Sequence, residues 1–70
     1  MIEVKSQISG TVWQVLVEVG QEVEEDEDLI ILESMKMEIP VSAPKNGKVK
    51  EIKISPSQPV QEGDVLLVLE

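Results

Sequence analysis

Lysine, carboxylate and hydroxyl groups carry all the side-chain chemistry open to this 70-residue sequence, because it has no cysteine and no histidine. It therefore offers no disulfide framework, no thiol nucleophile, no imidazole base and no zinc site of the usual ligand types. Among the six lysines, Lys36 stands in an unusual setting, between Met35 and Met37. The first question is what a lysine in that setting can do.

The two methionines set Lys36 apart from the other lysines. They are two of only three in the chain, and the third is Met1. Tight turns usually carry Gly, Asn or Asp, whereas methionine is flexible and polarizable and suits contact with another protein. We predict an exposed Lys36 whose methionine neighbours are recognised by a partner. The alternative is that both methionines fold back onto the core.

Composition excludes several other functions. A net charge of −8 and a pI of about 4.3 disfavour binding to nucleic acid or to an anionic membrane. The longest apolar runs, 29–32 and 65–69, are too short to span a bilayer, and no signal peptide is evident at the N-terminus. Residues 22–28 hold six carboxylates but lack the ligand pattern of a calcium loop, so we expect a solvated turn there. We predict a cytoplasmic protein without a metal site.

An internal repeat organises the whole chain. With an offset of 37, residues 2–33 align with residues 39–70 without a gap, and ten of the 32 aligned pairs are identical. Between the copies lies the segment 34–38, which contains Lys36. We predict one domain over residues 1–70, with this linking segment as a hairpin at one end and the two chain termini together at the other.

Each copy has the pattern of β-strands. Residues 11–17 and 48–54 are rich in β-branched residues, and the apolar runs near 29–33 and 65–70 are too short for helices. A slip in the alternation between Val49 and Ile52 predicts a bulge. We expect an all-β fold with four strands in each copy. The architecture is a flattened barrel or sandwich (a barrel-sandwich hybrid) of two four-stranded antiparallel sheets with quasi-twofold symmetry.

Trp13 is the only aromatic residue. It shares strand parity with Val15 and Val17, which predicts a position in the core or at a sheet edge, although its repeat counterpart is Lys50. Glu33 has Glu70 as its counterpart, which favours a structural role at the end of a strand.

The central segment Glu33-Ser34-Met35-Lys36-Met37-Glu38 resembles the attachment motif of the biotinyl/lipoyl-attachment family, in which a Met-Lys-Met turn carries biotin on its lysine. Five flanking segments are similar as well: 9–12, 19–23, 29–33, 43–49 and 60–66. The resemblance is to biotin carboxyl carriers that lack the inserted segment between early strands known as the thumb, and to small free-standing biotin/lipoyl attachment proteins. Members of this family commonly have alanine at the position of Ser34. The turn 24–28 is more acidic than the corresponding turn in the family.

This resemblance implies a carrier rather than an enzyme. Biotin on Lys36 would take up carboxylate at a biotin carboxylase and deliver it at a carboxyltransferase. A biotin protein ligase would attach it, with Met35, Met37, Glu33 and Ser34 as its recognition residues. An ordinary lysine has a pKa of about 10.4 and is almost wholly protonated at neutral pH, so the base and the activated acyl group must come from that ligase. We expect the carrier to be a monomer.

Two alternatives remain open. Lipoate, attached by a lipoyl ligase, is the other cofactor that this family places on the same lysine, and a small member could accept both. Lipoyl domains usually have Asp-Lys-Ala where this chain has Met35-Lys36-Met37, which favours biotin. The third interpretation, from a different functional class, is an unmodified docking or spacer module.

Overall fold

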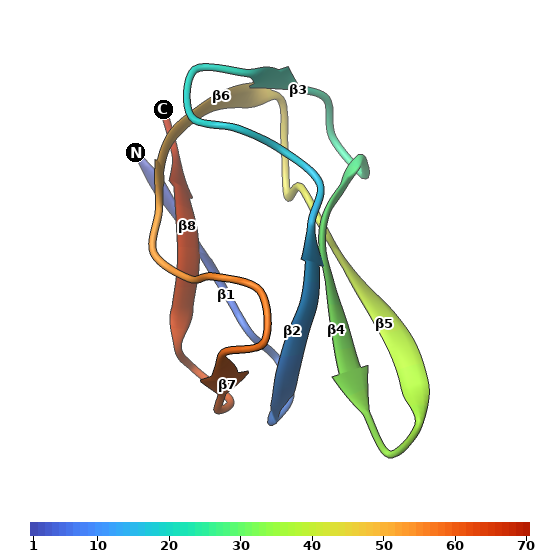
Figure 1. Cartoon of the computed structure of the whole chain (residues 1–70). Helices are drawn as coiled ribbons and strands as arrows, with labels where there is room; N and C mark the ends of the chain where they lie inside the picture. The colour runs from blue at the N-terminus through green and yellow to red at the C-terminus, as the bar shows by residue number, and fades with distance from the viewer.

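The computed structural model describes residues 1–70 as eight β-strands, with no helix among them (Figure 1). The strands are β1 (Ile2–Lys5), β2 (Gly10–Val15), β3 (Glu22–Val23), β4 (Asp28–Ser34), β5 (Met37–Ser42), β6 (Gly47–Ile52), β7 (Pro59–Val60) and β8 (Val65–Leu69). Four strands come from each repeat copy, and all pairings are antiparallel. The predicted all-β class is therefore confirmed.

The two sheets mix the repeat copies. One sheet has the strand order β1-β8-β6-β3 and the other has β5-β4-β2-β7. Replacing each strand by its counterpart four places along the chain converts the first order into the second, which is the predicted quasi-twofold symmetry. The two sheets face each other as a sandwich and do not close into a barrel. Of the two predicted forms, a flattened barrel or a sandwich, the molecule therefore has the sandwich.

The core lies between the sheets because the apolar positions of the strands point inward. Leu29, Ile30 and Leu32 of β4 and Leu66, Leu67 and Leu69 of β8 have no exposed surface. The polar segments before these two strands each contribute one buried valine to the core. These are Val23 and Val60, and each is 3% exposed. In a chain of this size such regular packing matters, because a small domain buries a comparatively small share of its surface on folding.

The hairpin and the chain termini lie at opposite ends of the molecule (Figure 1). The molecule is elongated, with extents of 30 × 18 × 17 Å. Strands β4 and β5 extend to one tip, and the N- and C-termini lie side by side at the other end, where Ile2 pairs with Leu69. The symmetry thus leaves the linking turn alone at its tip.

Both copies contain a bulge at the same place. The register of β6 against β8 shifts between Val49 and Glu51, which confirms the predicted bulge. The register of β2 against β4 shifts between Val12 and Gln14, so that Trp13 is the extra residue. The prediction of a core or sheet-edge position for Trp13 was therefore wrong: β2 is an inner strand, and the side chain is 46% exposed.

Gly10 lies where the backbone of β2 closely approaches the end of β4. A Cβ atom at this position would lie 2.6 Å from the carbonyl oxygen of Glu33. The other copy repeats the contact, with 2.8 Å between a Cβ at Gly47 and the carbonyl oxygen of Glu70. Both distances are too short for a side chain, which gives a physical reason for glycine in both copies and explains why the repeat keeps this pair.

We predict that Gly10→Ala and Gly47→Ala each lower the free energy of unfolding by about 1–3 kcal/mol, because the added methyl group must push backbone apart. Urea denaturation of the two variants measures this effect. Ser9→Ala, at an exposed neighbouring position, is the control and should unfold as the unaltered chain does. Unchanged stability of both glycine variants would contradict the close approach.

Candidate functional site

Lys36 lies in the two-residue loop of the β4–β5 hairpin. Ser34 pairs with Met37 across the hairpin, which leaves Met35 and Lys36 as the connecting residues. Both have positive φ angles, 53° for Met35 and 64° for Lys36. Positive φ at both central positions is the signature of the type I′ turn, whose twist matches that of the strands it joins.

The residues in this turn are unusual for its backbone conformation. Type I′ turns strongly favour Asn-Gly and similar pairs, because residues with a Cβ atom are strained at positive φ. Met35 and Lys36 accept this strain, of roughly 1–2 kcal/mol per residue by the general estimate for left-handed conformations. Their side chains, rather than their turn-forming ability, therefore account for their presence.

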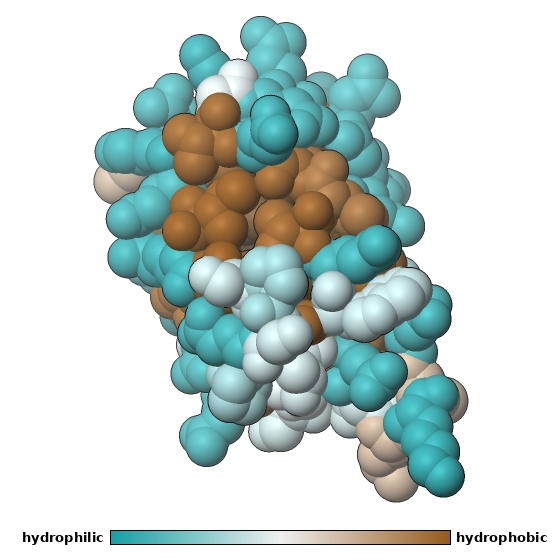
Figure 2. Space-filling view, viewed as in Figure 1, coloured by the Kyte–Doolittle hydropathy of each residue, from teal (hydrophilic) through white to brown (hydrophobic).

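The tip is open to solvent, as predicted. Met35 is 90% exposed and Met37 is 59% exposed, so the alternative in which both methionines fold back onto the core is wrong. Lys36 is exposed and takes part in no hydrogen bond or ion pair; the chain's one ion pair joins Lys53 to Glu51. The tip projects from the body at the lower right of Figure 2. The Lys36 side chain is thus accessible to a partner.

Two carboxylates flank the hairpin just below the tip. Glu33 and Glu38 are directly opposite each other in the pairing of β4 with β5, and both are exposed. Directly paired residues point to the same face of a sheet, so two negative charges lie close together there, which is unfavourable unless a cation approaches. Ser34 and Met37, the next pair, point to the opposite face. The hairpin therefore has an acidic face, and Met37 lies on the other.

The region around Lys36 is a projection and not a pocket. One groove, of about 560 Å³, lies between β1 and β5, and a second, of about 730 Å³, lies beside β3 and β6. Neither is lined by a residue of the segment 33–38. No group of three acidic side chains is arranged to hold a metal ion. The tip therefore offers an exposed side chain and no enclosed volume.

Comparison with known proteins agrees with this geometry. The model of the biotin/lipoyl family, described as biotin-requiring enzyme, matches residues 1–69. The chain belongs to the biotin/lipoyl family. Its sequence is 48% identical over 66 residues to the biotin/lipoyl attachment protein of Bacillus subtilis, which covers 94% of this chain and 90% of that protein.

Larger proteins contain similar domains. Pyruvate carboxylase of Bacillus subtilis is 40% identical over 67 residues, 96% of this chain but 6% of the carboxylase. The crystal structure of Kluyveromyces lactis urea carboxylase superposes with a TM-score of 0.93 at 35% identity, covering 99% of this chain and 6% of that one. This biotin/lipoyl domain thus has the fold of one small part of those enzymes.

Sequence reasoning missed one exposed feature. Trp13, Leu16 and Val19 are all exposed, and only the position of Trp13 was predicted from the sequence, in the core or at a sheet edge. The repeat contained the missing signal, because a bulge predicted between Val49 and Ile52 implies an equivalent bulge around Trp13 in the first copy. No helix of this domain is long and apolar enough to cross a membrane.

We predict that Met35→Asn raises the free energy of unfolding by roughly 0.5–1 kcal/mol, because asparagine tolerates positive φ better than methionine does. Thermal and urea denaturation measure the gain. Met37→Asn is the matched control: it removes a similar exposed side chain at a position without positive φ, so it should bring no gain. Equal effects of the two substitutions would contradict the strained turn.

Proposed function

We propose that residues 1–70 form a single attachment domain that carries biotin on the Nζ atom of Lys36. The observation that carries this proposal is the free amine of Lys36 at the tip of a two-residue hairpin, in a chain of a family described as biotin-requiring. The domain is a carrier and not an enzyme. It is the substrate of a ligase and then a mobile component of a larger reaction system.

Attachment needs a partner because the domain supplies only the nucleophile. Amide formation requires the Nζ atom to lose a proton and attack an activated carboxyl group, and the tip holds neither a base nor a cavity for the acyl donor. A biotin protein ligase provides both. Met35 and Met37 offer it exposed apolar contacts, while Glu33, together with Glu38, offers it paired negative charge. Ser34, beside the turn, is small enough to let the ligase approach.

The hairpin determines where the attached group can go. Bound biotin supplies the chemistry of carrying a carboxyl group between two active sites. The chain places the Cα atom of Lys36 in a short, paired turn, from which the side chain extends into solvent. A long arm on a fixed anchor raises the effective concentration of the group at each enzyme it reaches. Those enzymes are a biotin carboxylase and a carboxyltransferase.

The net charge of −8 bears on how the carrier associates. Like-charged copies repel each other, so we propose that the domain acts as a monomer. The enzymes that use the arm are cytoplasmic in this proposal. Lipoate is the second candidate for the same lysine, because the similar protein of Bacillus subtilis is named a biotin/lipoyl attachment protein.

We predict that Lys36→Arg abolishes modification and leaves stability unchanged, because arginine keeps the charge but has no acylatable primary amine. The measurement is the intact mass of domain purified from cells supplied with biotin and lipoate, with the modified residue located by peptide fragmentation. A biotinyl increment on Lys36 supports the carboxyl carrier, and a lipoyl increment supports the second candidate.

The same experiment can reject the site or the function. The other five lysines are its internal controls: Lys5, Lys45, Lys48, Lys50 and Lys53. Label on any of these in the Lys36→Arg variant would reject the site. Unaltered domain that gains no mass with a competent ligase would favour an unmodified docking module.

We predict that Met35→Asn lowers the specificity constant of the ligase for the domain by about tenfold or more, in line with the loss of a buried apolar contact at an interface. Stability and recognition then change in opposite directions, so a folding defect cannot explain the loss. Initial rates of biotin incorporation measure the effect. Unchanged rates would show that the ligase does not contact Met35.

A further inference from the structure

Three exposed apolar side chains lie within seven residues at the end of β2 and in the connection to β3. Trp13 is 46% exposed, Leu16 is 44% exposed and Val19 is 62% exposed. Together they form what we call the apolar strip. They account for half of the exposed large apolar residues; the others are Met1 and the two methionines of the hairpin. Figure 2 shows a group of strongly apolar residues in the upper half of the molecule, away from the projecting tip.

The internal repeat provides a control for whether the fold needs this strip. With the offset of 37, the counterparts of Trp13, Leu16 and Val19 are Lys50, Lys53 and Pro56. The backbone is the same in both copies, since both have the bulge and equivalent hydrogen bonds. The N–H of Leu16 donates to the carbonyl of Leu29 at 2.9 Å, and the N–H of Lys53 donates to that of Leu66 at 2.9 Å.

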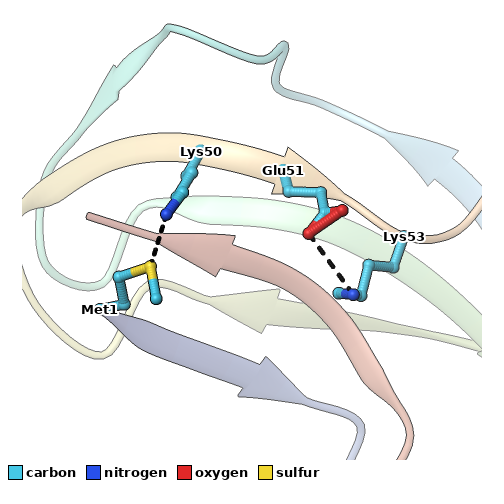
Figure 3. Close-up of polar contacts among 4 residues, drawn as sticks. All are labelled: Met1, Lys50, Glu51 and Lys53. Carbon is cyan, nitrogen blue, oxygen red and sulfur yellow. Dashed lines mark hydrogen bonds and ion pairs between the residues drawn. The ribbon is translucent and has the colours of Figure 1, made fainter.

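The counterpart face has charged side chains at two of the three positions, Lys50 and Lys53. Lys53 forms an ion pair with Glu51 at 3.4 Å, and the Nζ atom of Lys50 lies 2.7 Å from the sulfur of Met1. Figure 3 shows these side chains on the outer face of the sheet that contains β6. The fold therefore tolerates lysine at two of the three positions, so folding does not explain Trp13 and Leu16 in the first copy.

The charge of the chain restricts what can cover the strip. Glu18 lies within it and Glu22 follows it, both exposed, and the whole domain carries a net charge of −8. A second copy would bring an equal negative charge onto this surface, which disfavours self-association. A protein surface with an apolar centre and a basic rim is complementary to it.

The strip runs from β2 toward the end of the molecule that carries the termini. Trp13 lies on β2 beside Leu32 and Ile31 of β4. By contrast, the connection that holds Leu16 and Val19 lies away from the β4–β5 tip (Figure 1). The strip contains no residue of the hairpin turn, so a protein can bind its Leu16 and Val19 end without contacting Lys36. Such an arrangement holds the carrier near an active site while the modified side chain remains mobile, which raises its effective concentration there.

We infer that the apolar strip is the docking surface for the biotin carboxylase that uses the arm, through an apolar patch on that enzyme ringed by basic side chains. The identity of this partner rests on the proposed function. The existence of the surface rests on the repeat and the charge alone.

The first test compares three double variants in the biotinylated domain. Trp13→Lys with Leu16→Lys copies the side chains of the second repeat, and Trp13→Gln with Leu16→Gln removes the apolar surface without adding charge. Lys50→Gln with Lys53→Gln alters the counterpart face and is the matched control. Each is assayed as substrate of the biotin carboxylase encoded in the same genome.

Both strip variants should raise the KM for the domain at least about tenfold, as loss of central interface contacts does, and act on KM rather than kcat. The control variant should keep its KM. Unchanged KM in both strip variants, or an equal rise in the control, overturns the inference. A defect confined to biotinylation by the ligase also overturns it, because the surface would then serve the ligase.

The second test does not depend on biotin. Because Trp13 is the only tryptophan, 5-fluorotryptophan labels the strip at a single site, and its ¹⁹F resonance reports contact there. In the Lys36→Arg variant, which cannot be modified at Lys36, titration with the biotin carboxylase should shift this resonance. Dilution of the domain alone should not.

The outcomes separate the two proposals. No shift with the enzyme, or a shift that depends only on the concentration of the domain, overturns the docking surface. Failure of the unaltered domain to become biotinylated overturns the carrier function instead, while the ¹⁹F titration still decides whether the enzyme binds the strip.

Discussion

The close approach of the β2 backbone to the end of β4, its neighbour in the same sheet, is repeated between β6 and β8 and is the constraint on which the rest of this structure depends. At each approach the position facing the carbonyl of Glu33 or Glu70 has no room for a Cβ atom, and glycine stands there in both copies. Around these two strand pairs, each copy contributes two strands to each sheet. Neither copy can then bury its apolar residues alone, so the two halves must fold together around one core.

Because this interleaving follows a twofold axis, the functional information lies where the two copies differ. The strands, bulges and buried valines recur at the same offset and serve the fold. The twofold axis relates the hairpin turn with Met35 and Lys36 to the end of the molecule where the two termini lie. The turn therefore has no second copy within the repeat. The apolar strip corresponds to a lysine-bearing face. A repeat of this kind separates residues kept for folding from residues kept for binding within a single molecule.

Much of this arrangement could be predicted from the sequence because it depends on local patterns. The offset between copies, the eight strands and the exposed lysine all follow from residue types and spacing. The position of Trp13 could not be predicted in this way, because the alternation of inward and outward side chains is interrupted at a bulge. One inserted residue moves every following side chain to the other face of the sheet. The left-handed turn at Met35 was also hidden, since neither Met nor Lys is a residue that signals positive φ.

The strained turn has a mechanical consequence for a carrier. A longer, glycine-rich loop would reach the same backbone geometry without strain, but it would add its own motion to that of the attached arm. The two-residue turn instead pairs Ser34 with Met37 and fixes the backbone on both sides of Lys36. The Lys36 side chain extends from this paired turn, so the reach of a group attached to it would be set by the length of that side chain and of the group. The two strained residues thus place Lys36 at a position that the pairing of β4 with β5 defines.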